Sequence, residues 1–345
     1  MTTRSTSLPL VRALAAACAS AIVLSSCGAG DRDGDAQGGR PTLTLVTYSS
    51  FPAADTPLNE ALDEFTAETG IGVRIAQAGD TGTMVNKAIL TAGTPEGDVM
   101  WGVDNTFLSA AIDGGVFEGD PVDVDYGDVC VNYDIEWFDA AGLEPPSTLD
   151  DLLEPAYRDL LVVQDPTSSS PGLAFLLATI AAEGTRWPDY WTALVDNGVE
   201  VVDSWDIAYY ERFSGYAGGS GDRPLVVSYG SSPPAEVILA DPPRDDAATG
   251  VAAETCFRQI EYAGVLSGTD HPEEARLLVD FLRSERFQAE LALTLFVYPA
   301  LEGVALPDEF RRFAVIPDDP YTLDPAAIAE NREQWQDRWS EIVRR

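Results

Sequence analysis

Short apolar runs alternate with amphipathic segments along most of the chain. Leu43–Tyr48 and Ile71–Ile75 have the length and apolar content of buried strands. Between them, Leu58, Leu62 and Phe65 recur at helical spacing, after a Thr-Pro start signal and before a closing glycine. Strands that alternate with helices indicate an α/β fold built on parallel sheet.

Polar residues directly after such strands are candidate ligand contacts, because open α/β sheets bind ligands beyond the carboxyl ends of their strands. Tyr48 and Ser49 follow the first apolar run, and Asp104 follows the run at residues 98–103. These three residues are therefore predicted to lie at a binding site.

Two serine-rich loops share one pattern. Gln164–Gly172 follows an apolar run, and Gly230–Ser232 follows the strand-like run Leu225–Tyr229. In both loops a serine precedes a proline, so Ser170 is expected to cap one helix and Pro233 to begin the other. Hydroxyls and free N–H groups at a helix N-terminus suit an anionic or polar ligand group, although Ser-Pro also starts helices that bind nothing.

Further helices are expected in the second half of the chain. One holds the adjacent pair Tyr209 and Tyr210, and another covers residues 286–293. The last helix carries Trp335 and Trp339 at helical spacing, which we expect to pack as core.

The N-terminal residues have the pattern of a targeting segment. Two arginines precede the apolar run Ala13–Leu24, which is too short to span a membrane, and Leu-Ser-Ser-Cys ends at Cys27. This resembles a bacterial lipobox, so residues 1–27 are predicted to be a lipoprotein signal peptide with Cys27 lipidated. An ordinary signal peptide is the alternative. Residues 28–40, rich in Gly and Asp, are expected to be a flexible tether. We expect a protein outside the cytoplasm, bound to the membrane through lipid alone.

The chain is strongly acidic, with 57 acidic and 21 basic side chains and a net charge of −36. Such a charge repels nucleic acid and anionic lipid, and it favours cationic ligands. General acidic solubility explains the charge equally well.

Two cysteines remain beyond the leader. Cys130 and Cys256 each lie in a strand-like run, at Val129–Tyr133 and Thr255–Tyr262. In an oxidising compartment such a pair predicts one disulfide.

The residues of most catalytic and metal centres are missing from the sequence. His271 is the one histidine, and its place before Pro272 at a helix start suits a solvated cap. Nucleophile-elbow, phosphate-loop and dinucleotide motifs are absent, and the usual zinc ligands cannot be assembled. We therefore expect a protein that is not an enzyme and holds neither metal nor cofactor.

Aromatic residues at strand ends and loop edges are the more informative signal. Stacking and cation–π attraction make such rings suited to flat or cationic heterocycles, and a carboxylate such as Asp104 completes the recognition of a cation or amine. Each ring alone is more often core than site. The set comprises Tyr48, Phe51, Tyr126, Trp205, Tyr209, Tyr229 and Tyr298.

From residue 43 onward the sequence resembles the thiamine-binding proteins of bacterial ABC importers, which are two-lobed periplasmic binding proteins of type II. The more specific motifs are Gln164–Gly172 and Val227–Ala235, supported by Thr47–Phe51 and Gly102–Asn105. The resemblance implies an α/β fold with a ligand cleft between two lobes. Residues 41–125 and 263–345 would form one lobe and residues 126–262 the other, in a monomer that serves an ABC permease.

The resemblance also implies roles for individual residues. Trp205 and Tyr229 would stack on the rings of thiamine, with Tyr48 and Tyr298 at the rim and Asp104 as the anionic partner. Four hydroxyls would hold the hydroxyethyl or phosphate tail, those of Ser168, Ser169, Ser231 and Ser232. Related proteins can carry tryptophans near Thr56 and at Phe296, where this chain has none.

Three alternatives stay open. A ferric-ion receptor could use Tyr209 and Tyr210 as phenolate ligands, although neighbours on a helix diverge by about 100°. Polyamine or sugar capture is a weaker alternative within the same superfamily. From another class, a phosphatase could use the serine-rich loops.

Overall fold

The computed structural model describes residues 41–242 and 244–344. The predicted signal peptide, Cys27 and the tether at residues 28–40 lie outside these residues. None of the described helices is long and apolar enough to cross a membrane.

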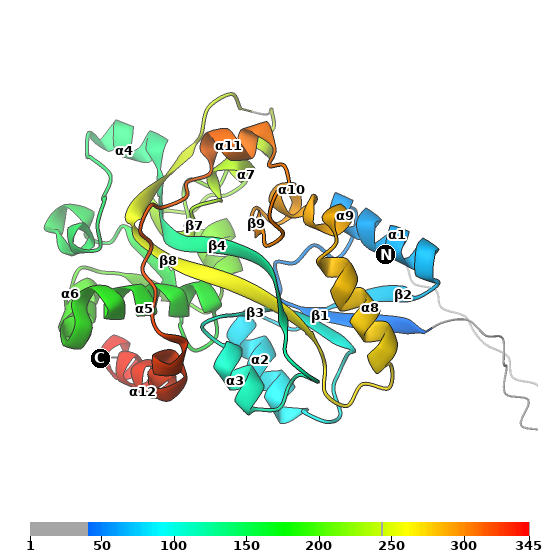
Figure 1. Ribbon diagram of the computed structural model, residues 1–345. Helices are drawn as coiled ribbons and strands as arrows, with labels where there is room; N and C mark the ends of the chain where they lie inside the picture. Colours follow the sequence, from blue (N-terminus) through cyan, green and yellow to red (C-terminus); the bar gives the residue numbers. More distant parts are fainter. Residues whose placement is uncertain (1–40, 243, 345) are drawn as a thin grey trace, which may run out of the picture. The chain divides into compact units, whose positions relative to one another are not determined.

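The described part of the chain forms a nine-stranded sheet in the order β2-β1-β3-β8-β4-β7-β5-β6, with β9 paired to β4 (Figure 1). The strands are β1 (Thr42–Thr47), β2 (Gly72–Gln77), β3 (Val99–Asp104), β4 (Val122–Asp134), β5 (Leu161–Gln164), β6 (Glu200–Val202), β7 (Leu225–Tyr229), β8 (Thr249–Val265) and β9 (Tyr298–Pro299). The α-helices are α1 (Pro57–Thr69), α2 (Thr81–Leu90), α3 (Leu108–Asp113), α4 (Ile135–Ala141), α5 (Ser170–Glu183), α6 (Trp187–Asp196), α7 (Pro233–Ile238), α8 (Pro272–Leu282), α9 (Glu285–Gln288), α10 (Leu291–Thr294), α11 (Asp308–Phe313) and α12 (Pro325–Val343).

Two groups of parallel strands form the ends of the sheet. Strand β1 pairs in parallel with β2 and β3, and β5 pairs in parallel with β6 and β7. Helices connect the strands within each group, as parallel pairing requires. The predicted α/β fold is confirmed.

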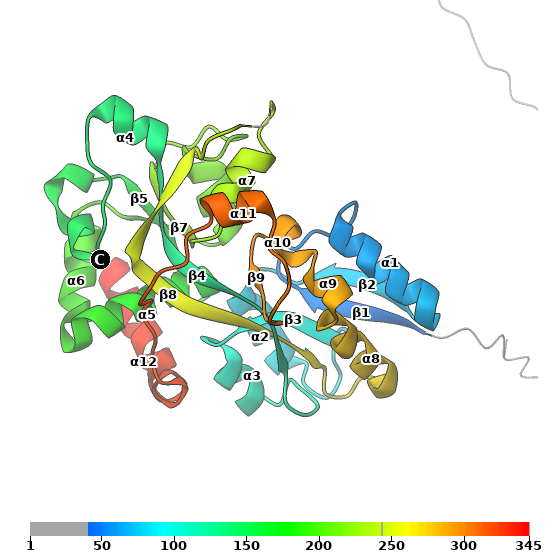
Figure 2. The same cartoon turned by 45° about the horizontal axis from the view of Figure 1, so that its top comes forward.

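Two long antiparallel strands, β4 and β8, lie side by side between these groups (Figure 2). Strand β8 also pairs with β3, and β4 also pairs with β7. Strands β4 and β8 both begin earlier than predicted. The apolar runs that begin at Val129 and Thr255 cover only part of each strand. The earlier part of β4 contains the acidic residues Asp125 and Asp128, which are buried although they interrupt the apolar pattern.

The predicted disulfide is present. Cys130 on β4 and Cys256 on β8 are bonded, with their Cα atoms 4.1 Å apart. The bond therefore joins the two central strands, which lie between the two groups of parallel strands.

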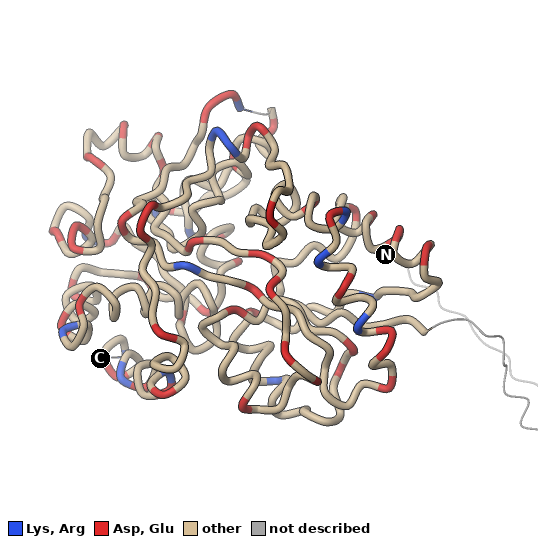
Figure 3. The backbone as a smooth tube through the Cα atoms, viewed as in Figure 1, with Lys and Arg blue, Asp and Glu red and all other residues tan. Residues whose placement is uncertain are grey.

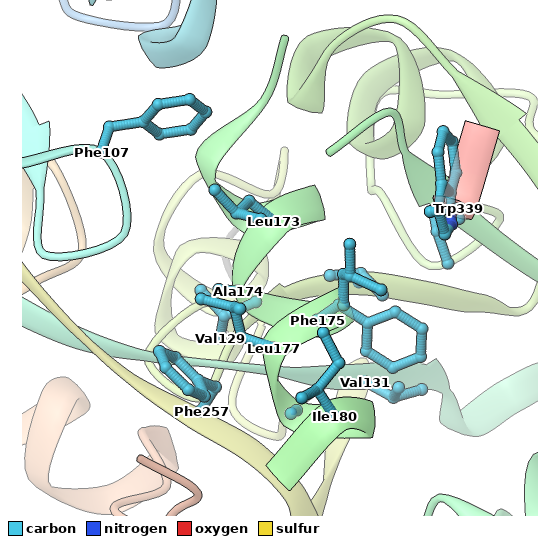
Figure 4. Close-up of a cluster of buried hydrophobic side chains, with 14 of the residues drawn as sticks. Phe107, Val129, Val131, Leu173, Ala174, Phe175, Leu177, Ile180, Phe257 and Trp339 are labelled. Carbon is cyan, nitrogen blue, oxygen red and sulfur yellow. The ribbon is translucent and has the colours of Figure 1, made fainter. Parts of the chain in front are cut away.

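Helix α5 lies within the larger apolar core, and residues 170–180 are all buried. Figure 4 shows Phe175 of this helix together with Val131 of β4 and Phe257 of β8. The final helix joins the same core through Trp339, which meets Trp191 of α6 edge to face with ring centroids 5.5 Å apart. The core position expected for Trp339 is confirmed.

The start and end predicted for the first helix are also confirmed. Thr56 caps α1 and exchanges hydrogen bonds with Asn59 in a capping box. Gly70 ends the helix with a φ of 73°. Leu58 and Phe65 face a second apolar core beneath β1 and β3.

Three helix predictions need correction. The segment with Tyr209 and Tyr210 forms a short π-helix, η4 (Ile207–Arg212). Residues 286–293 are divided between α9 and α10 by a turn at residues 289–290. Helix α5 begins one residue earlier than expected, so Ser169 is its cap and Ser170 its first residue.

Acidic residues are spread along the whole described chain, while basic residues are sparse (Figure 3). The lobe boundaries inferred from the sequence fall within β4 and near the end of β8. They remain a prediction.

Candidate functional site

A cavity of about 280 Å³ opens among the loops that follow β1, β2, β6 and β7. Its aromatic wall contains Tyr48, Trp205, Tyr209, Tyr210, Tyr216, Tyr229 and Phe296. Its acidic residues are Asp80, Glu236 and Glu261. None of the described residues that line it is Lys, Arg or His. The cavity therefore combines ring faces with negative charge.

The segment around η4 supplies one side of the aromatic wall. Trp205 stacks on Tyr209 with ring centroids 4.8 Å apart and planes 15° apart. Tyr210 meets Trp205 edge to face at 5.2 Å. The indole Nε1 donates to Ser228 Oγ at 3.1 Å, which fixes the ring on β7. Trp205 is thus held on its stacked face and at its nitrogen.

Tyr48 and Tyr229 lie where β1 and β7 end, and each rests against a glycine. Gly102 has a φ of 103°, and a Cβ there would collide with the ring of Tyr48. A Cβ on Gly127 would lie 3.0 Å from the ring of Tyr229. Burial, followed by nearby carboxylates including Glu261, raises the pKa of both phenols well above the usual range. Both therefore stay neutral hydrogen-bond donors.

Asp80 connects two sides of the cavity. As the cap of α2, its carboxylate accepts from Thr81 N at 3.1 Å, and the other oxygen accepts from Trp205 N at 3.1 Å. Burial raises its pKa, and the hydrogen bond from Trp205 N partly opposes that rise. Asp80 is therefore a lining carboxylate that also positions the aromatic segment.

The other two acidic residues of the cavity, Glu236 and Glu261, differ in their hydrogen bonds. Glu236 accepts from the Tyr209 hydroxyl and from Ala217 N, both at 2.8 Å. Glu261 is 6% exposed, and its Oε2 has no hydrogen-bond partner. Burial, together with Asp125, Asp104 and Asp80, raises its pKa well above the usual range. Glu261 is the acid of this cavity with an oxygen left for a ligand.

Asp104 lies behind the wall and is not among the lining residues. Its carboxylate is fully buried and accepts from Thr106 Oγ1 at 2.8 Å, Phe107 N at 3.2 Å and Gln259 Nε2. Burial raises its pKa to about 6. Three protein donors thus hold this carboxylate in place behind the wall.

Of the four serines predicted to hold the tail of the ligand, only one lines the cavity. Ser232 lines the cavity, whereas Ser168, Ser169 and Ser231 do not. The Ser168 hydroxyl donates to the Asp203 carbonyl at 2.7 Å, and its own carbonyl accepts from the start of α2. Ser170 and Pro171, the first two residues of α5, line the cavity in place of Ser168 and Ser169.

Tyr298 also lies away from the lining. It is buried and stacks on Tyr126 with ring centroids 5.2 Å apart. Phe296 and Val297, which come just before it, line the cavity in its place.

The structure brings four of the residues predicted from the sequence together at one cavity, namely Tyr48, Trp205, Tyr229 and Ser232. It missed Asp80, although the rule that selected Asp104 applies equally to the loop after β2. It missed Glu261 because nothing in the sequence distinguishes this residue from other polar positions of a strand. The register of the strands places Glu261 beside the buried acids Asp104 and Asp125.

The chain belongs to the family of bacterial extracellular solute-binding proteins, whose family model matches residues 48–289. It is a binding protein and not an enzyme, which excludes the phosphatase alternative. Its fold is that of the type II periplasmic binding proteins.

Among its relatives, the thiamine-binding periplasmic protein of Escherichia coli (strain K12) is 29% identical over 319 residues, covering 89% of this chain and 94% of that protein. A solved periplasmic thiamin binding protein is similar with a TM-score of 0.78 and 26% identity, covering 89% of this chain and 97% of that one. Iron uptake protein A1 of Synechocystis sp. is 23% identical, with coverage of 91% and 93%.

Proposed function

We propose that this protein captures thiamine outside the cytoplasm and delivers it to an ABC importer. The observation that carries the proposal is a cavity with aromatic walls and three carboxylates, and with no basic side chain among its described lining residues. Thiamine has a flat aminopyrimidine and a positively charged thiazolium ring, which match these two features. The names of the relatives in Escherichia coli and among solved structures support the same ligand.

The roles that we propose for individual residues are based on the geometry of the cavity. Trp205 and Tyr229 offer ring faces for stacking, with Tyr48 beside them. Glu261 and Asp80 face the positive charge, and Asp104 adds to the negative potential from behind the wall. The hydroxyls of Ser170 and Ser232, together with the start of α5, suit the hydroxyethyl group.

The wider assignment rests on the sequence. Residues 1–27 would be removed as a lipoprotein signal peptide, leaving Cys27 lipidated and residues 28–40 as the tether. The mature chain would be a monomer whose two lobes close on the ligand and dock on the permease. The acidic charge argues against a nucleic-acid partner.

A ferric-ion role fits the cavity less well, although an iron uptake protein is among the relatives. The Tyr209 hydroxyl donates to Glu236, and burial raises its pKa well above the usual range, which opposes phenolate formation. No group of three or more His, Cys, Asp or Glu in the described residues could hold a metal ion. Polyamines share the positive charge of thiamine but offer no ring to stack.

Calorimetric titration of the purified protein with thiamine, spermidine and Fe³⁺ in parallel tests the proposal. We expect saturable heat and quenching of tryptophan fluorescence with thiamine, because Trp205 forms part of the wall. Absence of heat with thiamine, together with binding of either alternative, would reject the assignment.

A further inference from the structure

One ring of the cavity wall is carried by a glycine-rich segment, residues 214–222, which connects η4 to β7. Tyr216 of this segment lines the cavity, whereas residues 217–220 beside it are exposed. Part of the wall therefore lies on a surface loop, while Tyr48 and Tyr229 lie at the ends of strands of the sheet.

Tyr216 ends a chain of ring contacts that begins at Trp205. Trp205 contacts Tyr210 edge to face, and Tyr210 in turn contacts Tyr216 edge to face with ring centroids 4.9 Å apart. The ring centroid of Tyr209 lies 6.0 Å from that of Tyr216. The ring of the glycine-rich segment therefore belongs to the same aromatic surface as the indole of Trp205.

Two glycines of the segment leave room for this ring. A Cβ added to Gly218 would lie 3.0 Å from the Tyr216 hydroxyl oxygen, and one added to Gly219 would lie 2.9 Å from the ring. Neither glycine has a positive φ, so the backbone conformation does not require them. The close approach of the Tyr216 ring accounts for both.

A hydrogen bond ties the middle of the segment to α7. Ala217 N donates to Glu236 Oε2 at 2.8 Å, and the other oxygen of this carboxylate accepts from the Tyr209 hydroxyl at 2.8 Å. Glu236 is 3% exposed, and hydrogen bonds to an ionised acceptor are stronger than those between neutral groups. Glu236 therefore holds the segment beside the ring that stacks on Trp205.

The other backbone contacts of the segment are local. Ser214 N donates to the Arg223 carbonyl at 3.0 Å, which joins the two ends, and Gly219 N donates to the Tyr216 carbonyl at 3.0 Å, which closes a turn. Exposed segments with few hydrogen bonds to the rest of a protein open at a low cost in free energy. A loop with joined ends can therefore move as a unit when the bond to Glu236 breaks.

We propose that residues 214–222 form a lid over the aromatic cavity, in which Tyr216 is a further ligand-binding residue and Glu236 holds the lid through Ala217 N. Closure places the Tyr216 ring against the ligand and excludes water from this side of the cavity, and opening lets the ligand leave. This inference rests on the proposed function, because thiamine supplies the flat rings that Tyr216 contacts.

Calorimetric titration with thiamine tests the ligand contact. Tyr216→Ala should weaken binding by about tenfold, because one aromatic contact is lost. Tyr216→Phe keeps the ring and removes only the hydroxyl, so it is the matched control and should retain the wild-type affinity. Both variants should unfold at the same urea concentration as the ligand-free wild type, which a merely structural role of the ring would not allow.

Ala217→Pro tests the attachment of the lid. Ala217 is the second residue of the turn from Tyr216 to Gly219, a position that favours proline, so the variant removes the N–H without opposing the turn. Stopped-flow tryptophan fluorescence should show thiamine leaving this variant about threefold to tenfold faster than the wild type. Ala217→Ser keeps the N–H and should release thiamine at the wild-type rate.

The outcomes separate this inference from the proposed function. Unchanged affinity in Tyr216→Ala, or unchanged release in Ala217→Pro, would overturn the lid while the wild type still binds thiamine. Absence of heat when the wild type is titrated with thiamine would reject the proposed function, and the ligand role of Tyr216 would fail with it.

Discussion

At the scale of single residues, Gly102 positions an aromatic ring by having no side chain. Its φ of 103° and the ring of Tyr48 directly against it leave no room for a Cβ. We predict that Gly102→Ala displaces Tyr48, lowers the unfolding free energy by about 1–3 kcal/mol and weakens thiamine binding. Urea unfolding and calorimetry measure the two effects.

Gly303→Ala is the matched control. Gly303 has a φ of 86°, but a Cβ there meets nothing within 4 Å. The Gly303→Ala variant should therefore lose unfolding free energy through backbone strain alone, and its affinity for thiamine should be unchanged. Equal losses of affinity in the two variants would show that the contact with Tyr48 does not matter.

The buried acids predict how binding depends on pH. Burial raises the pKa of Asp104 to about 6, and the pKa values of Asp80 and Glu261 also lie above their usual ranges. In the ligand-free protein these groups keep protons that the unfolded chain has released, so their contribution to stability falls as pH rises from about 4 through 6. A bound cation lowers the same pKa values and expels protons.

Thiamine affinity should therefore rise with pH between about 5.5 and 8, while Tyr48 and Tyr229 stay neutral. Titrations in buffers with different ionisation enthalpies should detect protons released on binding. Affinity that is independent of pH, with no proton release, would contradict this role of the acids.

Residue-scale reasoning from the sequence reached the lining of the cavity where local chemistry was sufficient. Trp205 and Tyr229 were recognisable as rings beside turns. Asp104 is also polar and lies at a strand end, but it is fully buried behind the wall, where it accepts from Thr106, Phe107 and Gln259. Only tertiary contacts reveal that Glu261 is the acid with a free oxygen.

At the scale of elements, the start of α2 docks on the serine-rich loop before α5. Gly82 N and Thr83 N donate to the Ser168 carbonyl at 2.8 and 3.3 Å. A Cβ on Gly82 would lie 2.7 Å from that carbonyl oxygen. The loop thus satisfies helix N–H groups of another element, in addition to any ligand role.

Gly82→Ala tests this junction. Replacing a helical glycine by alanine ordinarily stabilises a helix by about 0.5–1 kcal/mol. Here we predict a loss of about 1–3 kcal/mol, because backbone atoms must separate. Chemical denaturation measures this change in unfolding free energy. A stabilised variant would show that the backbone at the junction can move apart without a loss of stability.

Among the elements, helix starts were more predictable than helix shapes. The Ser-Pro pairs placed the starts of α5 and α7 within one residue, because proline and its capping neighbour act locally. The π-helical turn at Tyr209 and Tyr210 was not predicted. Its rings pack on Trp205 and Tyr216, which are tertiary contacts without a local pattern.

At the scale of the whole molecule, the disulfide joins β4 to β8 across 126 residues of sequence. Closing a loop of this length restricts the unfolded chain and stabilises the fold by about 4–5 kcal/mol in the loop-entropy model. We predict that the double variant Cys130→Ala, Cys256→Ala unfolds at lower urea concentration and lower temperature.

The wild type with and without reductant provides the comparison. Reductant should lower the unfolding temperature of the wild type and leave that of the double variant unchanged. Thiol titration of the unfolded, unreduced protein should detect neither Cys130 nor Cys256. Two reactive thiols there would contradict the bond.

The alternation of strands and helices predicted the α/β class, and the two remaining cysteines predicted their own pairing. The long strands β4 and β8 were recognised only in part. Their acidic residues, such as Asp125 and Asp128, look like loop positions until the neighbouring strands bury them.

The most direct measurement is a crystal structure of the protein with thiamine. The account predicts the vitamin in the cavity, with its rings against Trp205 and Tyr229 and its thiazolium ring beside Glu261 or Asp80. Thiamine bound elsewhere, or held in the cavity with its positive charge pointing away from both carboxylates, would contradict it.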